Sequence, residues 1–256
     1  MCVAAAAAVG VRTYTHRGAT GHRSAFTPAD TALAKPWLYF YPVRSAPVAR
    51  AFMVFFGNDV AFWEPHQDIA WRLAGSGISV VGVDLRKYLA TLPTTEPQRD
   101  SMFAESVAVL ISRARHALAA DSVPVLIAGH SFGAEVGLWV ALHRPPRGLI
   151  GVLAMNPRST GHLSITVADV MNREASGAWS FSTVDAVRDI DPAVRIALVR
   201  SGKDRFRSYD PRFRAAGGSR LRLFSVPLAS HSLTSMLVAR PIILRAVQFL
   251  LPPIAP

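Results

Sequence analysis

The chain has 256 residues, 50% of them hydrophobic, which suffices for one large domain with a sizeable core and excludes a mostly disordered protein. Cys2 is the only cysteine, which excludes an intrachain disulfide and a cysteine-based zinc or redox centre. The formal net charge of +11 creates a field that attracts anionic partners.

Residues 1–35 show no hydrophobic periodicity, and we treat them as an N-terminal segment before a domain over residues 36–256. Val3–Val11 is a short apolar run without the preceding basic residues of a secretory signal. It is also shorter than the roughly 20 residues that span a bilayer. The run is either a plain N-terminal segment or the remnant of an export signal, so localisation stays open.

Strands and helices alternate in the first part of the domain. Trp37–Val43, rich in aromatic and β-branched residues, predicts a strand, and the apolar run Ala51–Phe56 predicts a strand buried on both faces. Pro65–Ala74 predicts a helix that ends at two glycines, and Ile78–Val83 predicts the next buried strand. Leu85–Thr95 has the composition of a loop.

The middle of the chain continues this alternation. Apolar residues spaced three and four apart predict a helix over Pro97–Ala120. Its predicted buried face consists of Phe103, Val107, Leu110, Ile111, Ala114 and Leu118. Val123–Ala128 predicts a strand, and Ser131–His143 predicts a helix directly after it.

The last part of the chain adds three predicted strands, at Leu149–Ala154, Val194–Val199 and Leu221–Val226. Residues 156–193 carry few core signals and predict a small lid-like insertion, and Thr234–Leu251 predicts a terminal helix interrupted near Pro241. Alternating strands and helices indicate an α/β fold with a mostly parallel central sheet flanked by helices. In such folds ligands bind beyond the carboxyl ends of the strands.

The segment Gly129-His130-Ser131-Phe132-Gly133 has the spacing G-x-S-x-G, between a predicted strand and a predicted helix. This is the context of a nucleophile elbow, a strained turn that requires small residues two before and two after the serine. The serine hydroxyl then projects from the sheet edge, and the helix N-terminus points its dipole at the reacting oxygen. Ser131 is the predicted nucleophile.

A serine nucleophile needs a base, and the base needs an acid that orients it. On sheets of this kind the three residues follow in the chain order Ser, Asp, His. Asp204 follows the predicted strand Val194–Val199, and His231 lies between the last predicted strand and the last helix. The predicted triad is therefore Ser131, His231 and Asp204.

Other side chains compete for the acid and base roles. Asp210 is an alternative acid, although it lies further beyond the strand end than Asp204. His162, in the insertion, is the alternative base. Of the remaining candidates, Asp84 ends an earlier predicted strand, where the simpler role is to cap a turn. His116 and His143 lie in predicted helices, and His130 lies inside the elbow itself, where we expect the ring to pack aside.

The tetrahedral intermediate of acyl transfer needs two hydrogen-bond donors. One is predicted to be the backbone N–H of Phe132, directly after the nucleophile. The other is expected from the loop after Ala51–Phe56, where Asn58 is our candidate. The simpler interpretation of that loop is that it only turns the chain.

Candidate substrate-binding residues come from two places. Lys203 and Arg205 flank Asp204 and predict a basic rim that suits an anionic substrate or an anionic bilayer. Trp179, in the insertion, lines an acyl or lipid pocket or belongs to a small satellite core. Between Arg195 and Arg245 there are eleven basic and two acidic residues. This excess indicates either an anionic partner or only the general use of arginine as a solvated surface residue in an arginine-rich genome. Clustered arginines without a stacking platform are weak evidence for nucleic acid, so none is expected as a partner.

Two segments resemble the bacterial virulence-protein family of VirJ and AcvB. Gln67–Leu89 contains Val80-Val81-Gly82-Val83-Asp84-Leu85-Arg86-Lys87-Tyr88, and Gly129–Val136 is similar to the family's elbow G-Y-S-F-G-A-D-V. The similarity runs loosely from Val54 to Leu250. The chain departs from the family at Gly57–Val60, where the family has a glycine-rich stretch.

The resemblance implies an exported α/β-hydrolase, periplasmic or membrane-associated, that hydrolyses aminoacylated phosphatidylglycerol, with Ser131, Asp204 and His231 as its triad. Together the sequence predicts an α/β-hydrolase fold and a serine hydrolase of small-molecule or lipid esters. We expect neither a metal nor a cofactor, and an anionic membrane surface is a candidate partner. The alternative is a non-catalytic, VirJ-like hydrolase-fold factor for binding or secretion.

Overall fold

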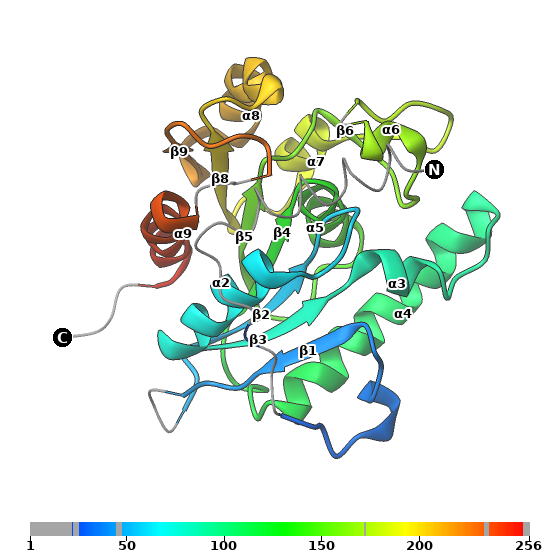
Figure 1. Cartoon of the computed structure of the whole chain (residues 1–256), viewed down its shortest axis with the longest axis vertical. Helices are drawn as coiled ribbons and strands as arrows, with labels where there is room; N and C mark the ends of the chain where they lie inside the picture. Colours follow the sequence, from blue (N-terminus) through cyan, green and yellow to red (C-terminus); the bar gives the residue numbers. More distant parts are fainter. Residues whose placement is uncertain (1–21, 23–25, 45–47, 172, 233–235, 253–256) are drawn as a thin grey trace, which may run out of the picture.

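The computed structural model describes residues 22, 26–44, 48–171, 173–232 and 236–252 (Figure 1). The apolar run Val3–Val11 and Cys2 lie outside these residues, as does the predicted start of the last helix at Thr234. Across the described ranges, no helix is both long enough and apolar enough to cross a bilayer.

The main sheet has the strand order β1-β3-β2-β4-β5-β8-β9. Its strands are β1 (Leu38–Tyr41), β2 (Ala51–Phe56), β3 (Ile78–Val83), β4 (Val125–His130), β5 (Leu149–Met155), β8 (Arg195–Ser201) and β9 (Leu221–Val226). β1 runs antiparallel to β3, and every other neighbouring pair is parallel. The predicted, mostly parallel central sheet is confirmed.

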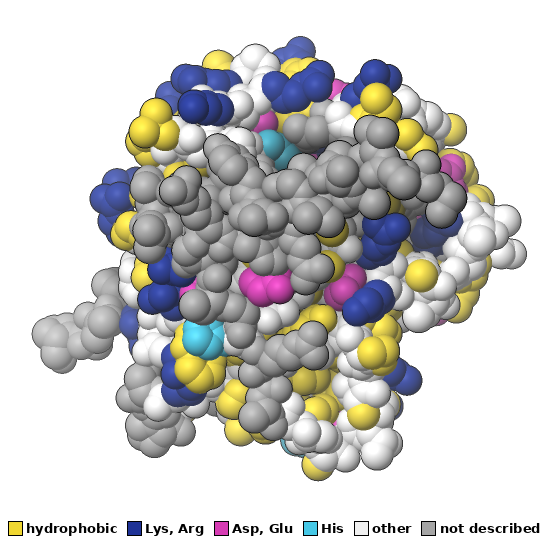
Figure 2. Space-filling view, in the orientation of Figure 1, with side chains coloured by type: hydrophobic (Ala, Val, Ile, Leu, Met, Phe, Trp, Pro, Cys, Tyr) yellow, Lys and Arg dark blue, Asp and Glu magenta, His cyan; other side chains and the backbone are white. Residues whose placement is uncertain are grey.

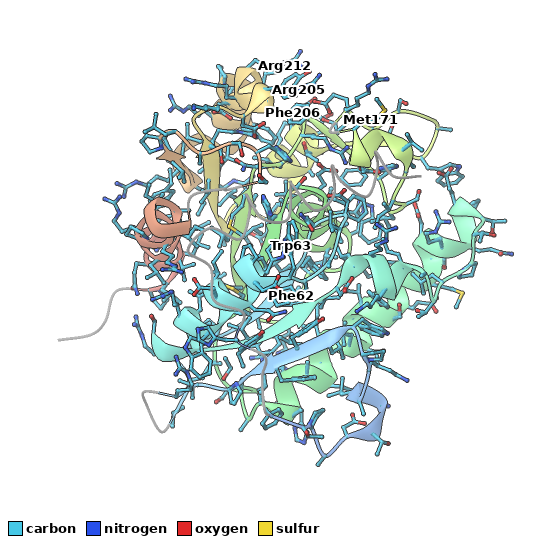
Figure 3. The ribbon with its side chains drawn as sticks, in the orientation of Figure 1. Phe62, Trp63, Met171, Arg205, Phe206 and Arg212 are labelled. Carbon is cyan, nitrogen blue, oxygen red and sulfur yellow. The ribbon has the colours of Figure 1, made fainter. Side chains whose placement is uncertain are left out.

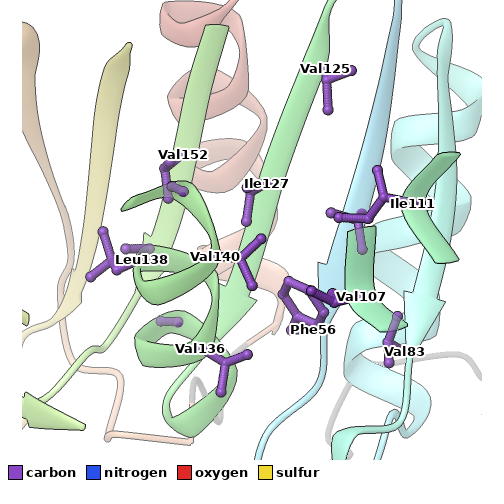
Figure 4. Close-up of a cluster of buried hydrophobic side chains, with 14 of the residues drawn as sticks. Phe56, Val83, Val107, Ile111, Val125, Ile127, Val136, Leu138, Val140 and Val152 are labelled. Carbon is purple, nitrogen blue, oxygen red and sulfur yellow. The ribbon is translucent and has the colours of Figure 1, made fainter. Parts of the chain in front are cut away.

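Helices cover both faces of this sheet (Figure 1). On one face the core contains side chains of α4 (Glu96–Ala117), α5 (Phe132–His143), α7 (Thr183–Asp189) and α8 (Asp210–Gly217). Figure 4 shows Val140 of α5 beside Ile127 of β4 in this cluster. Because both faces are covered, every residue of β2, β3 and β4 is buried, as the continuous apolar runs predict.

The opposite face is covered by α2 (Glu64–Gly75) and α9 (Met236–Leu250). Pro241 lies inside α9 and does not interrupt it, contrary to the sequence prediction. Ala239 and Ile243, on either side of the proline, are completely buried against the sheet. This packing outweighs the hydrogen bond that a proline cannot donate.

Two short helices depart from the sequence prediction. Residues Leu85–Leu89 form α3 rather than a loop, and the carboxylate of Asp84 caps the helix by accepting from the backbone N–H of Lys87 at 3.2 Å. The helical segments η2 (Arg205–Tyr209) and α8 follow β8 and were not predicted. Within α8 only Phe213 and Gly217 are buried, which is too few apolar positions to produce a periodic pattern.

The insertion over residues 156–193 folds into β6 (Thr160–Gly161), α6 (Val167–Val170), β7 (Phe181–Ser182) and α7. β6 and β7 form a separate two-stranded antiparallel sheet. Leu163 of the insertion is buried in the main core. Trp179, in contrast, is 46% exposed.

Candidate active site

Ser131 lies on the turn between β4 and α5 with φ 53° and ψ −122°, a left-handed backbone conformation that is rare for a serine. The turn is closely packed on both sides. A Cβ on Gly129 would lie 2.0 Å from the carbonyl oxygen of Gly133, and a Cβ on Gly133 would lie 2.1 Å from that of Gly57. These positions therefore require glycine, as the elbow pattern predicts.

The residues of the predicted triad, far apart in sequence, meet at the carboxyl end of the sheet. The Oγ of Ser131 lies 2.7 Å from Nε2 of His231. The Nδ1 of the same imidazole lies 3.1 Å from Oδ1 of Asp204. Because the carboxylate accepts a hydrogen bond from the N–H at Nδ1, the neutral ring presents a lone pair at Nε2 to the serine hydroxyl. The arrangement can draw the proton from Ser131 during nucleophilic attack.

Asp204 is almost completely buried, and both its oxygens accept hydrogen bonds. Besides His231, the donors are the backbone N–H of Phe206 at 3.1 Å and the guanidinium of Arg200 at 2.8 Å. Burial on its own would raise the pKa of this carboxyl, but the hydrogen bond and charge of His231 and the charge of Arg200 outweigh it and lower the pKa. Asp204 is therefore held ionised beside the base.

The competing candidates have other contacts. Asp210 accepts from Nε of Arg200 at 2.8 Å, whereas Asp204 accepts from Nη1 of the same guanidinium. His162 is buried and bonds the carboxylate of Asp169 at 3.1 Å. The geometry thus brings Asp204 and His231 to Ser131 in preference to these two.

The two predicted oxyanion donors lie on adjoining segments. Phe132 begins α5, so its backbone N–H is one of the groups that a helix leaves without an intrahelical partner. The loop of Asn58 touches this helix through the close approach of Gly57 to Gly133. The side-chain oxygen of Asn58 accepts from the backbone N–H groups of Val60 at 3.1 Å and Ala61 at 3.2 Å. This oxygen therefore stabilises the shape of the loop. Because an oxyanion needs a donor, only the N–H groups of Asn58 can stabilise it.

No protein-family model matches the chain, and no match to a curated protein was found. Solved structures do match. A soluble variant of monoglyceride lipase from Saccharomyces cerevisiae aligns with a TM-score of 0.60 at 12% identity, covering 91% of this chain and 94% of that one. An α/β serine hydrolase without lid from Xanthomonas campestris aligns with a TM-score of 0.58 at 17% identity, covering 93% and 99%. The protein has the α/β-hydrolase fold.

A third match is the esterase domain of a Rhodothermus marinus protein, with a TM-score of 0.56 at 16% identity, covering 82% of this chain and 90% of that one. At these identities the likeness establishes the fold alone. The comparisons give no support to the narrower resemblance to VirJ and AcvB.

A buried ion network joins the elbow helix of this hydrolase fold to the insertion. Arg158 forms two parallel hydrogen bonds of 2.6 Å with Glu135, in the first turn of α5, and a third of 2.5 Å with Asp169. Burial raises the pKa of Glu135, against the charge of Arg158. At Asp169 the hydrogen bond from His162 and the charge of Arg158 outweigh burial and lower the pKa to about 2. Sequence reasoning missed this network, which has no local signature.

We expect Arg158→Met to lower the free energy of unfolding by about 3–5 kcal/mol, because it leaves two buried carboxylates without their counter-ion. The matched control is Arg188→Met, whose ion pair with Asp185 on α7 is 59% and 51% exposed. Loss of that exposed pair should leave the free energy of unfolding nearly unchanged. Urea unfolding monitored by tryptophan fluorescence measures the free energy of unfolding of both variants. Equal small decreases in the two variants would show that the network does not anchor the insertion.

The rim beside the triad is basic and carries an exposed apolar side chain. The backbone N–H of Lys203 donates to the carbonyl of Ala229 at 2.9 Å, so the loops that carry Asp204 and His231 lie side by side. Leu228, just before Ala229, has φ 62° and is 79% exposed. Exposed basic side chains follow along the loop after β8 and into α8: Lys203, Arg205, Arg207, Arg212 and Arg214. Figure 3 labels Arg205 and Arg212 at this end, and Figure 2 shows basic and hydrophobic side chains gathered there.

The predicted substrate-binding residues Lys203, Arg205 and Trp179 all have exposed side chains. Two of them belong to the basic rim, whereas Trp179 lies just before β7 in the insertion. Their role in substrate binding stays a prediction. In the described part of the chain, no group of three or more potential metal ligands is close enough together to hold an ion.

Proposed function

We propose that the protein is a serine hydrolase of carboxylic esters, with Ser131 as nucleophile, His231 as general base and acid, and Asp204 as the group that orients the imidazole. The observation that carries the proposal is the continuous hydrogen-bond chain from Ser131 Oγ through His231 to Asp204. It begins at a serine held at positive φ on a nucleophile elbow. The α/β-hydrolase fold is compatible with this activity but does not by itself imply it.

The reaction proceeds in two halves. The Oγ of Ser131 attacks the ester carbonyl carbon while its proton passes to Nε2 of His231, and a tetrahedral oxyanion forms. We assign its stabilisation to the backbone N–H of Phe132 and an N–H of Asn58. The bond from carbon to the alcohol oxygen then breaks, and the alcohol leaves with the proton from His231.

Water completes the cycle. It attacks the acyl group on Ser131 and gives a proton to His231, and the second tetrahedral intermediate collapses to release the carboxylic acid. The proton returns from His231 to Oγ of Ser131. Asp204 stays ionised throughout and stabilises the imidazolium that forms in each half.

For the substrate we propose lipid esters, including aminoacyl esters of phosphatidylglycerol, with the enzyme acting at an anionic bilayer. Support comes from the basic rim and from Leu228, an exposed apolar side chain three residues before His231 in the loop that carries the base. Exposed apolar and basic side chains on the same rim suit an anionic lipid surface, where each basic residue contributes about 1 kcal/mol. Small esters remain substrates of the same chemistry.

We expect the protein to bind vesicles of phosphatidylglycerol and phosphatidylcholine more strongly than vesicles of phosphatidylcholine alone. The double variant Arg205→Gln/Arg212→Gln should weaken this partitioning by roughly tenfold or more. The matched control, Arg144→Gln/Arg147→Gln, removes two exposed arginines near the amino end of β5, at the opposite edge of the sheet. Vesicle sedimentation with equal effects of the two double variants would contradict a specific docking rim.

Ester turnover tests the activity itself. A panel of neutral acyl esters and aminoacyl-phosphatidylglycerol is offered to the folded protein, and at least one should be hydrolysed at a rate that a fluorophosphonate abolishes. Folded protein that hydrolyses none of them and resists the fluorophosphonate would instead favour a hydrolase-fold binding factor. A preference for aminoacyl or neutral esters within the panel identifies the acyl group.

A further inference from the structure

We infer that His130 and Asn156 are positioning residues that hold the backbone of His231 in place through its carbonyl oxygen. The inference rests on the proposed function, because it explains how the base is aligned with the nucleophile. Neither residue contacts the serine hydroxyl in the hydrogen bonds of the site.

The carbonyl oxygen of His231 receives two hydrogen bonds from buried side chains. The Nε2 of His130 lies 3.0 Å away and the Nδ2 of Asn156 lies 2.6 Å away. His130 is 3% exposed and Asn156 is completely buried. A backbone carbonyl can only accept, so both nitrogens must carry a hydrogen that points at it. The backbone of the base is therefore fixed by two donors shielded from water.

The proton at Nε2 of His130 determines the state of a second histidine. The neutral ring of His130 then has a lone pair at Nδ1, which lies 3.1 Å from Nε2 of the buried His66 on α2. His66 must donate this bond. Burial, followed by the charge of His231, lowers the pKa of His130 to about 4, so the ring stays neutral near neutral pH. The two imidazoles form an ordered chain from α2 to the base loop.

Asn156 acts from the end of β5 and joins three segments. Its Oδ1 accepts from the backbone N–H of Ser201 at 2.8 Å, while Nδ2 donates to Oγ of Ser201 at 2.8 Å and to the carbonyl of His231. The two hydrogens of the amide are thus both used. Asn156 has φ 51°, a conformation that asparagine and aspartate tolerate better than most residues.

As a consequence, residues at the ends of two neighbouring strands fix the position of the base relative to the nucleophile. His130 immediately precedes Ser131 at the end of β4, and Asn156 follows β5, the neighbouring strand. The loop with His231 is thereby fixed to the same rigid edge of the sheet that carries Ser131. Removing either donor should let the imidazole drift, and a displacement of about 1 Å can cost about 100-fold in rate.

The test compares three variants by steady-state ester hydrolysis. His130→Leu removes the donor at similar volume, and His130→Gln keeps an amide N–H near the position of Nε2. Asn156→Asp turns the donor into an acceptor that repels the carbonyl, while keeping the bond from Ser201 and the tolerance of positive φ. We expect His130→Leu and Asn156→Asp to lower kcat about 10- to 100-fold with KM nearly unchanged. His130→Gln should recover most of the loss.

A role confined to general packing would not produce this split between kcat and KM, nor rescue by glutamine. Wild-type kcat in folded His130→Leu and Asn156→Asp would overturn the inference while leaving the serine-hydrolase proposal intact. If wild type hydrolyses no ester and resists a fluorophosphonate, the proposed function fails instead.

A measurement on the wild-type protein decides the geometry even where a variant does not fold. Two-bond ¹⁵N–¹H correlation spectra of ¹⁵N-histidine protein distinguish which ring nitrogen carries the proton, and His130→Gln assigns the His130 signals. We expect His130 and His66 protonated at Nε2 and His231 protonated at Nδ1. A proton at Nδ1 of His130 would overturn the proposed bond to the carbonyl of His231.

Discussion

Replacing Ser131 by alanine is expected to lower kcat for ester hydrolysis by about 10³- to 10⁶-fold, while the fold and its thermal stability persist. The hydroxyl bonds only His231 among the described contacts, so its loss leaves no buried polar group without a partner other than the imidazole itself. Residual turnover would come from the oxyanion donors and from substrate binding. Initial rates at equal concentrations of folded protein measure the effect.

The matched control is Ser208→Ala. Ser208 is an exposed serine of η2, the helical segment that directly follows Asp204. Its hydroxyl bonds only the carbonyl of Arg205 among the described residues. Its replacement should leave kcat and KM unchanged. A Ser131→Ala protein that keeps a rate within tenfold of wild type would contradict the assignment of the nucleophile.

The second large effect is expected from Asp204→Asn, with a loss in kcat of about 10⁴-fold, as for the equivalent change in a serine-protease triad. Both oxygens of Asp204 accept from donors, so an asparagine amide group must oppose one of them. The fixed charge of Arg200 disfavours the amide NH₂ on its side. The NH₂ group therefore turns toward His231 and donates to Nδ1, which forces the proton to Nε2. A ring protonated at Nε2 cannot accept the proton of Ser131.

Asp210→Asn separates this effect from a general disturbance of Arg200. Asp210 bonds the same guanidinium at 2.8 Å but makes no hydrogen bond to His231. Its replacement should change kcat by no more than a few-fold. Histidine ¹⁵N spectra of Asp204→Asn should show His231 protonated at Nε2, and a ring that keeps its proton at Nδ1 would argue against Asp204 as the orienting acid.

The elbow could be predicted because its chemistry is local. Gly129, Ser131 and Gly133 lie within five residues, and the sterics that select them operate inside one turn. Asp204 and His231 could be placed because parallel strands end at one edge of a sheet, so a residue just after a strand has a known neighbourhood. The long buried strands were predictable for the same reason, since a sheet covered on both faces needs continuous apolar runs.

The supporting contacts could not be predicted because they join residues far apart in sequence without a pattern of their own. His130 bonds the carbonyl of a residue 101 positions away, and Asn156 bonds the same carbonyl from 75 positions away. The network of Arg158 likewise depends on where the insertion folds over α5. Helix α8 escaped prediction because it buries so few side chains, and α9 runs through Pro241 because tertiary packing outweighs a local propensity.

Mass spectrometry of the protein after treatment with a fluorophosphonate shows whether Ser131 is an activated nucleophile, because the reagent requires a serine activated by its base. We expect one adduct per chain, mapped to the peptide that contains Ser131, with no adduct in Ser131→Ala and strongly slowed labelling in Asp204→Asn. Folded protein that takes up no reagent, or that carries the adduct on another residue, would contradict it.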